Sequence, residues 1–274
     1  MLVTACIAPH GGELIPALAQ GNLERMAVTR ASMEELGRRF LAAKPDTIVV
    51  LTPHGTQVAG CVTVGANELA AGSLDSEDGA RVSADFPVDL GLVEALLNRA
   101  AERDVPILPL AFADEDRNPL PFQLDWGAFI PLWFMGAKWE KRPEIVVLCP
   151  SRALPRTVLI DSGRVIAEVC AESERRVALI CSADQGHGHD ESGPYGFATD
   201  SAEYDAAYID AVRANQLDRL LEWEDAWIGC AMTDSFWQTL MLHGAMLHTR
   251  MRAELLSYEA PTYFGMAVAA CERA

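Results

Sequence analysis

The sequence predicts an α/β fold, organised as a single three-layer αβα domain around a mostly parallel or mixed central sheet. Short runs rich in β-branched residues alternate along the chain with segments whose apolar residues recur at helical spacing. Two of these runs, TIVVL (47–51) and EIVVL (144–148), are almost entirely apolar, which is typical of strands that helices cover on both faces. No repeat or break in composition divides the chain, so we expect one domain over residues 1–274.

The first half of the chain alternates strand-like and helix-like patterns. The segment 22–45 has apolar residues at helical spacing and stops at Pro45. In order, we expect strands at 2–8, 46–53, 60–66 and 105–112, with helices at 22–45 and 88–104.

The second half continues the alternation. We expect strands at 143–150 and 177–181, with helices at 162–176, 201–221 and 233–256, whereas 125–136 carries a mixed signal. Two polar segments that contain proline and glycine, 72–89 and 112–123, are predicted to be long loops over an active site.

Charge and composition exclude some classes of protein. Acidic residues outnumber basic ones by 39 to 22, and a net charge of −17 repels phosphate backbones, so we expect no nucleic-acid partner. No apolar run approaches the roughly 20 residues that span a bilayer, and the N-terminus lacks the basic start of a secretory signal. The seven cysteines show no CxxC spacing, which favours reduced thiols and a cytoplasmic location.

Histidines follow three of the expected strands. His10 and His54 each stand in a Pro-His-Gly tripeptide directly after a strand, and His187 follows the strand at 177–181. Functional groups of open α/β sheets gather beyond the carboxyl ends of the strands, so we expect these histidines to meet at one edge. Two imidazoles and a carboxylate on one side of an iron ion leave positions open for a substrate and O₂, and a third imidazole can act as a base.

A series of short motifs in fixed order resembles the class III extradiol ring-cleavage dioxygenases, most closely the catalytic (beta) subunit of the protocatechuate 4,5-dioxygenase type. The similarity covers most of the chain. The motifs are Pro-His-Gly at 9–11 and 53–55, Ser-x-Asp-x-x-His at 182–187, GPYGF at 193–197 and HGAM at 243–246. The resemblance implies a single αβα catalytic domain and a non-haem Fe(II) ion held by two histidines and one acidic residue.

The resemblance assigns roles to particular residues. It implies His10 and His54 as metal ligands and His187 as the acid/base. The acidic ligand of the family precedes the helix that carries the Gly-Ala segment, and Asp234 stands there in this chain. The family residue is usually glutamate, so Glu259 is the second candidate for the third ligand. An aspartate near a helix start can also serve as a cap.

One position departs from the family pattern. Within LDWGAFIPL, Trp126 stands where the family has a second active-site histidine, between the matching Asp125 and Gly127. The indole N–H can only donate a hydrogen bond, so it cannot relay a proton. Either His189 or another group substitutes for the missing histidine, or the substrate and the reaction step differ from the usual phenol cleavage. A further interpretation is that Trp126 is a pocket wall against which an aromatic ring packs.

Other residues have less defined roles. Tyr195 in GPYGF could hydrogen-bond the substrate or pack within its loop. His243 and His248 are five residues apart on an expected helix and so do not share a face, which favours packing or surface roles.

The resemblance therefore predicts an Fe(II)-dependent extradiol dioxygenase that opens a catechol-type ring with O₂ in aromatic catabolism. Zinc or manganese could occupy the same site, and a zinc-dependent enzyme is one alternative. The other is a non-catalytic metal-binding or redox protein similar to the Memo proteins, which resemble these dioxygenases in fold and histidine layout. We expect a small aromatic substrate and O₂ as partners, no membrane, and a homo-oligomer with or without a small second subunit.

Overall fold

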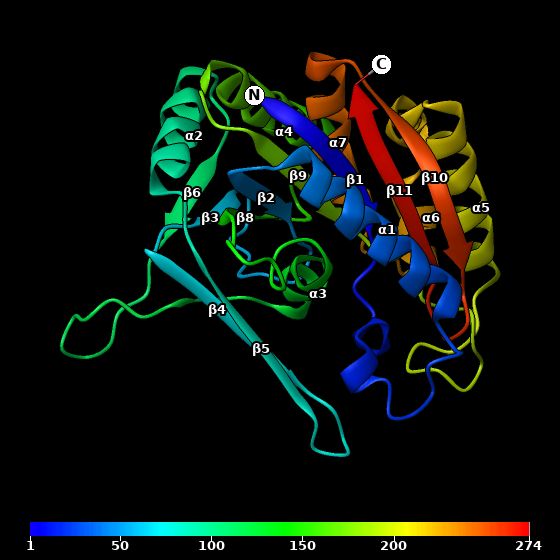
Figure 1. Cartoon of the computed structure of the whole chain (residues 1–274). Helices are drawn as coiled ribbons and strands as arrows, with labels where there is room; N and C mark the ends of the chain where they lie inside the picture. Colours follow the sequence, from blue (N-terminus) through cyan, green and yellow to red (C-terminus); the bar gives the residue numbers. More distant parts are fainter. Residues whose placement is uncertain (274) are drawn as a thin grey trace.

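The computed structural model describes residues 1–273, which form one mixed eight-stranded sheet, one small sheet and seven α-helices. The strands of the large sheet are β1 Leu2–Ala8, β2 Thr47–Leu51, β3 Val62–Gly65, β6 Ile107–Leu110, β8 Glu144–Pro150, β9 Val177–Ser182, β10 Met251–Glu259 and β11 Met266–Arg273. They lie in the spatial order β10-β11-β1-β9-β2-β8-β3-β6 (Figure 1).

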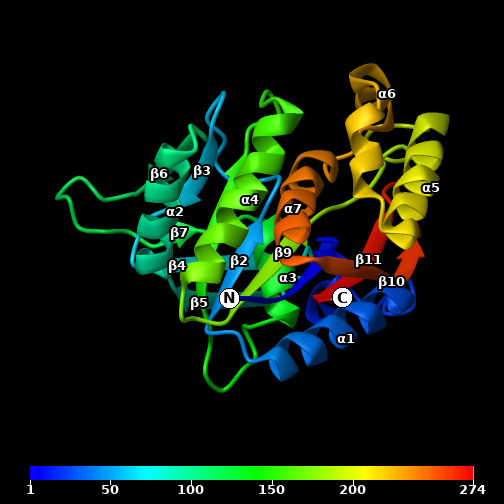
Figure 2. The same ribbon diagram turned by 90° about the horizontal axis from the view of Figure 1, so that it is seen from above.

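Helices cover both faces of this sheet. Their bounds are α1 Ala27–Ala43, α2 Leu90–Glu102, α3 Trp126–Phe134, α4 Arg156–Glu172, α5 Thr199–Ala214, α6 Asp225–Ala231 and α7 Phe236–Thr249. The view from above shows α4, α5, α6 and α7 on one side of the sheet and α1 on the other (Figure 2). The predicted α/β class and the three-layer arrangement are confirmed.

Alternate residues of the central strands supply two separate hydrophobic cores. In β2, Val49 and Leu51 pack with residues of α2, α4, α5 and α7, whereas Ile48 and Val50 pack with residues of α1 and α3. Successive side chains of a strand point to opposite faces, so an apolar strand such as TIVVL fills both cores at once.

Two glycines allow α4 and α7 to pack in direct backbone contact. A Cβ atom on Gly163 would lie 1.8 Å from the carbonyl oxygen of Met241, and one on Gly244 would lie 2.0 Å from that of Ile160. Only glycine fits at such a close approach. The contact fixes α7 against the sheet, and the residues that precede this helix reach the sheet edge.

The strands β1, β9 and β2 are neighbours in the sheet and run parallel to one another. Ala8 pairs with Ser182 at the end of β1, and Leu51 pairs with Cys181 at the end of β2. The chain therefore leaves these three strands at the same edge, which brings the segments after residues 8, 51 and 182 together.

The prediction of a loop over 72–89 was wrong for most of that segment. Strands β4 (Leu69–Asp75) and β5 (Arg81–Pro87) form an antiparallel hairpin, and β7 (Phe122–Gln123) pairs with β4 to complete the small sheet. In β5, the residues RVSADFP alternate exposed and buried along the strand. This period of two identifies a half-buried strand, although polar residues make up its outer face.

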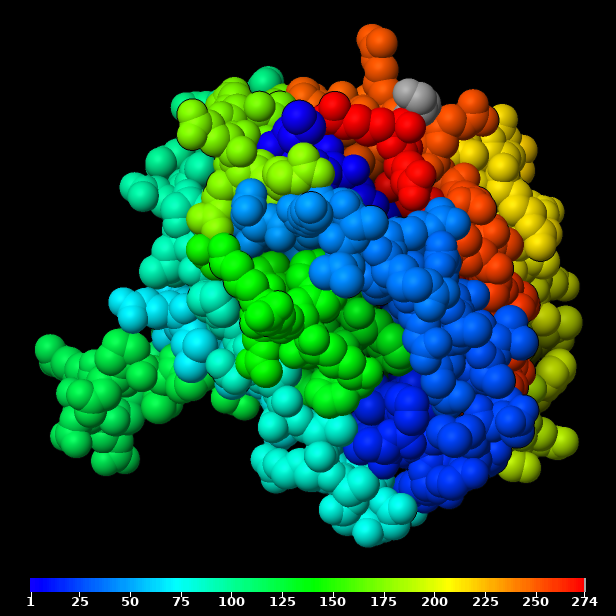
Figure 3. All heavy atoms as spheres, viewed as in Figure 1, coloured from blue at the N-terminus to red at the C-terminus, as the bar shows by residue number. Residues whose placement is uncertain are grey.

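The second predicted loop, 112–123, carries strand β7 at its end. The rest of the segment projects away from the body of the molecule (Figures 1 and 3).

The prediction of one helix over 233–256 was also wrong in its last third. Helix α7 ends at Thr249, and Arg250 adopts a left-handed conformation with φ of 54°. Glycine usually marks such a helix end, so an arginine there gave no signal. The chain then enters β10, which pairs with β11 along its whole length.

Other elements begin or end a few residues away from the predicted positions. The helix expected at 22–45 is α1, and that expected at 162–176 is α4, which begins at Arg156. The ambiguous segment 125–136 contains α3. No helix within residues 1–273 is both long and apolar enough to cross a membrane.

Candidate metal centre

Three side chains converge at the edge where β1 and β2 end. The Nε2 atoms of His10 and His54 lie 3.0 Å apart. The Oδ2 atom of Asp234 lies 3.3 Å from Nε2 of His10 and 2.9 Å from Nε2 of His54. All three potential ligand atoms fall within 4.8 Å of one another, which is the spacing of donors around a single metal ion.

A neighbouring strand orients the ring of His10. Its Nδ1 atom lies 2.9 Å from Oγ of Ser182, and the hydroxyl of Ser182 donates to the carbonyl oxygen of Gly127. Because that hydroxyl has only one hydrogen, Nδ1 of His10 must donate to Ser182. The Nε2 atom therefore supplies the lone pair that a metal needs, an arrangement typical of metal-binding histidines.

Asp234 precedes α7 and faces the histidines rather than capping the helix. Its Oδ1 atom accepts a hydrogen bond of 3.0 Å from the backbone N–H of Asp184. Its Oδ2 atom is buried and receives no well-aligned hydrogen bond within the described residues, and Nε2 of His54 lies 2.9 Å away. An ionised, buried carboxylate oxygen that faces two imidazoles is well suited to bind a metal.

The second candidate for the third ligand lies elsewhere. Oε1 of Glu259, in β10, accepts hydrogen bonds of 2.8 Å from the backbone N–H and 2.6 Å from the hydroxyl of Thr29. Glu259 thus holds the start of α1 and does not belong to the group of His10, His54 and Asp234.

Opposite charges shift the protonation of the buried cluster. Burial alone would lower the pKa of His10, but the carboxylates of Asp184 and Asp234 outweigh it and raise this pKa to about 9. Burial acts to raise the pKa of Asp234, but the adjacent His10 and His54 hold it well below its usual value. For Asp184, burial dominates and raises the pKa to about 6.

These shifts predict that metal binding depends on pH. With a pKa of about 9, the His10 ring is positively charged at pH 7 in the metal-free protein, with a proton on each nitrogen. A metal must displace one of these protons to bind. Below pH 9 we expect the apparent metal affinity to rise about tenfold per pH unit, with release of about one proton. Calorimetric titration in buffers of different ionisation enthalpy measures that proton, and equal affinities at pH 6 and pH 8 would contradict the prediction.

His187 lies beside the cluster. Its Nε2 atom is 4.0 Å from Oδ2 of Asp234. Its ring stacks on Phe264, with centroids 5.6 Å apart, and contacts Tyr263 and Tyr195. Its buried Nδ1 atom has no hydrogen-bond partner within the described chain. The structure thus brings the three histidines of the strand ends together, with Nε2 as the ring nitrogen of His187 that faces the cluster.

The two remaining catalytic candidates are placed differently. The Nε2 atom of His189 lies 2.8 Å from Oδ2 of Asp205, so this ring is bound to a carboxylate outside the cluster. Tyr195 contacts His187 edge-on but is 59% exposed, at the surface of the site.

Trp126 forms a wall over one of the histidines. Its ring stacks on that of His54 with centroids 4.2 Å apart, and it is 47% exposed. The preceding Asp125 caps α3 by accepting from the N–H of Ala128, and it also accepts from the hydroxyl of Thr52. The cap and the Thr52 bond fix the start of α3, and hence Trp126, close to the end of β2.

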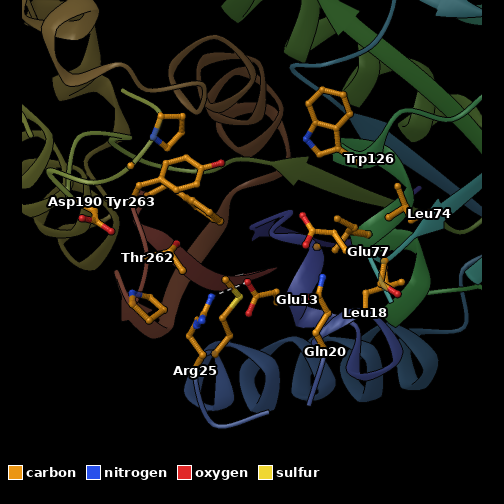
Figure 4. A pocket seen from close by; sticks show the side chains of 18 of the residues that line it. Glu13, Leu18, Gln20, Arg25, Leu74, Glu77, Trp126, Asp190, Thr262 and Tyr263 are labelled. Carbon is orange, nitrogen blue, oxygen red and sulfur yellow. Dashed lines mark hydrogen bonds and ion pairs between the residues drawn. The ribbon is translucent and has the colours of Figure 1, made fainter. Parts of the chain in front are cut away.

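A cavity of about 760 Å³ lies near this cluster. None of the three donors lines it, but Trp126, which stacks on His54, and Phe264, which stacks on His187, do. Trp126 and Tyr263 lie on opposite sides of the cavity (Figure 4). The tip of the β4–β5 hairpin also contributes to the lining, so part of the segment 72–89 does border the site as expected. The cavity is large enough for a single-ring aromatic molecule.

Several residues of the site were not predicted from the sequence. Ser182 contacts Nδ1 of His10, and Asp184 accepts from its backbone N–H. The two residues stand two positions apart at a strand end, so their side chains point to the same side of the extended chain. This spacing was the signal available in the sequence. Tyr263 and Phe264 gave no signal, because they approach His187 only through the pairing of β10 with β11.

Comparison with known proteins identifies a family for this chain. The profile of the catalytic LigB subunit of aromatic ring-opening dioxygenase matches residues 4–269. Protein CA_C1420 of Clostridium acetobutylicum is 22% identical over 262 residues, which cover 96% of this chain and 56% of that protein. The chain thus spans about half the length of this curated relative.

The fold is also found among solved structures. The crystal structure of uncharacterized protein JW3007 from Escherichia coli K12 matches with a TM-score of 0.62 and 17% identity, covering 98% of this chain and 99% of that one. At this identity the likeness shows a shared fold.

Proposed function

Because the chain belongs to the family of LigB catalytic subunits of aromatic ring-opening dioxygenases, we propose that it is an extradiol dioxygenase that opens a catechol-type ring with O₂. In this proposal His10, His54 and Asp234 hold an Fe(II) ion and His187 is the acid/base. The observation that carries the proposal is the cluster of two imidazoles and one buried carboxylate oxygen near a cavity with aromatic walls.

The donor set suits a ferrous ion with open positions. Two histidines and one carboxylate on one side of the metal are the ligands of many non-haem Fe(II) oxygenases. The chemistry that Fe(II) supplies when bound is Lewis acidity toward the catechol oxygens and a path for electrons from the ring to O₂. Both atoms of O₂ enter the ring-opened product, so the reaction needs no added reductant.

The protein contributes proton transfer and a shielded binding site. The Nε2 atom of His187, the ring nitrogen nearer the cluster, takes the proton of a substrate hydroxyl and returns it to the product. Phe264 and Tyr263 pack on this ring and limit the access of water to it. Trp126 offers a flat apolar surface on which the substrate ring can stack, and its N–H cannot accept a proton. Proton transfer therefore rests on His187.

Oxygen uptake by the reconstituted protein tests the proposed function. The protein is loaded with Fe(II) without oxygen, and a panel of catechols and air are then added. We expect O₂ consumption and a yellow ring-opened product with at least one catechol. Bound iron with no uptake for any catechol would favour a non-catalytic metal-binding protein, and activity restored only by zinc would favour a different reaction.

The charge of the cavity predicts which catechols are preferred. Its charged lining residues are Glu13, Asp75, Glu77, Asp190 and Arg25. The Arg25 guanidinium already pairs with Glu13 at 2.9 Å (Figure 4). A carboxylate on the substrate would therefore meet a mostly acidic surface.

We expect kcat/KM to be about three- to tenfold higher for a catechol with an ammonium side chain than for one of equal length with a carboxylate, since each exposed charge pair is worth about 1 kcal/mol. Steady-state O₂ uptake measures the ratio, which should shrink in 0.5 M salt and in a Glu77→Gln variant. A preference for the carboxylate at every salt concentration would contradict the prediction.

A further inference from the structure

The ring of His187 is held in place without hydrogen bonds of its own. Its Nδ1 atom has no partner within residues 1–273, and its Nε2 atom lies 4.0 Å from the nearest carboxylate oxygen of Asp234. The orientation of this ring must therefore come from its backbone and from the aromatic rings of Phe264 and Tyr263 that pack on it.

One buried carboxylate binds a residue on each side of His187. Asp205, in α5, is fully buried. Its Oδ1 atom accepts a hydrogen bond of 2.7 Å from the backbone N–H of Gly186. Its Oδ2 atom lies 2.8 Å from Nε2 of His189. The residues immediately before and two positions after His187 are thus fixed by the same side chain.

The same carboxylate also holds the segment that supplies the aromatic rings. The hydroxyl of Tyr258, in β10, donates to Oδ2 of Asp205 at 2.7 Å. The connection from β10 to β11 carries Tyr263 and Phe264, and a Cβ atom on the adjoining Gly265 would lie only 1.9 Å from Oδ2 of Asp205. Asp205 therefore packs directly against the backbone next to the rings that contact His187.

From this network we propose that Asp205 is a positioning residue for His187. It joins α5, the loop that carries His187 and the connection that carries Phe264, and it lies outside both the cavity lining and the metal cluster. It acts only through His187, so the inference rests on the proposed role of that histidine. A misplacement of about 1 Å can cost on the order of 100-fold in rate, which is the scale of effect that such a residue controls.

The substitution Asp205→Asn tests the proposal while preserving the shape of the side chain. An amide has one acceptor oxygen and cannot satisfy the three donors that the carboxylate binds. We expect kcat to fall about 10- to 100-fold, with KM and iron content within about twofold of the wild type. In Tyr258→Phe, which removes one of the three donors, we expect a fall of about two- to threefold.

A buried aspartate far from the cluster provides the matched control. Asp89 accepts a hydrogen bond from the backbone N–H of Leu92 and another from the hydroxyl of Thr47, so it too is a buried carboxylate that fixes backbone. Asp89→Asn should lower thermal stability and leave kcat unchanged. An equal loss of kcat in both variants would show that Asp205 has only a general structural role.

Nuclear magnetic resonance of ¹³C-labelled histidine gives a readout that does not require turnover. With six histidines in the chain, the Cε1 signal of His187 can be assigned by its loss in His187→Gln. We expect this signal to shift or broaden in Asp205→Asn and Tyr258→Phe, and to stay unchanged in Asp89→Asn.

An unchanged His187 signal in Asp205→Asn, together with kcat within twofold, would overturn the inference. If Asp205→Asn fails to fold, an unchanged His187 signal in Tyr258→Phe overturns the inference. A wild type that cleaves no catechol, with the His187 signal nevertheless shifted in Asp205→Asn, would refute the proposed function and leave Asp205 as the residue that positions His187.

Discussion

Replacing His10 with alanine is expected to weaken Fe(II) binding by at least about 100-fold. Loss of a residue that merely hydrogen-bonds a metal ligand already costs about 10- to 100-fold, and His10 would be a ligand itself. The same result is expected for Asp234→Ala, which removes the buried oxygen that faces both imidazoles. Iron analysis after dialysis against a weak chelator measures the loss, and circular dichroism checks that each variant is folded.

Each of these variants has a matched control in the chain. His243, in α7, is a second buried histidine but lies outside the cluster, so His243→Ala should retain iron. Glu259→Ala removes the carboxylate that holds Thr29 and should also retain iron, with reduced stability. Full iron content in His10→Ala, or a loss in Glu259→Ala equal to that in Asp234→Ala, would refute the assigned ligands.

Replacing His187 with glutamine is expected to leave iron bound and to abolish most turnover. Its Nε2 atom lies close to the cluster, but its proposed task is proton transfer, which contributes about 100- to 10,000-fold to a rate. We expect kcat to fall within that range, with iron content equal to that of the wild type. Single-turnover O₂ uptake, measured with substrate bound in advance, separates this step from substrate binding.

The exposed histidine of α7 serves as the control for this variant. His248 lies near the end of the helix, outside the cluster, so His248→Gln should have wild-type kcat. Loss of iron from His187→Gln would place His187 among the metal ligands, and an unchanged kcat would mean that another group moves the proton.

The location of the site could be predicted because it depends on strand ends. A histidine directly after an apolar run can be read from sequence, and β1, β9 and β2 are adjacent and parallel, so the three histidines reach the same edge. The identity of the acidic residue was harder to predict. In the sequence, Asp234 and Glu259 both lie near the C-terminal helix. In the structure the helix ends at Thr249, and β10 then carries Glu259 away from Asp234.

The aromatic surroundings of His187 and the role of Asp205 could not be predicted. The positions of Tyr263 and Phe264 and the bond from Tyr258 to Asp205 depend on β10 and β11, in a region where the sequence favoured a longer helix. The other two bonds of Asp205 join α5 to the loop after β9, and no sequence pattern marks them. β10 and β11 are consecutive strands, and strand propensity depends strongly on the partner strand, so the sequence of β10 alone did not separate strand from helix. The hairpin of β4 and β5 was missed although β5 alternates exposed and buried residues, because its outward-facing residues are polar.

The central position of β1 has a consequence for the synthesis of the protein. This first strand pairs with β9 and β11, whose residues begin at Val177 and Met266. A nascent chain therefore leaves one edge of β1 unpaired until β9 has been made and the other until β11 has been made, which at 5–20 residues per second takes on the order of ten seconds or more. The side chains of the three-donor cluster are also made at different times. His10 and His54 are made early, and the cluster is complete only when Asp234 emerges. Nascent chains that end before this residue cannot form the three-donor cluster of His10, His54 and Asp234.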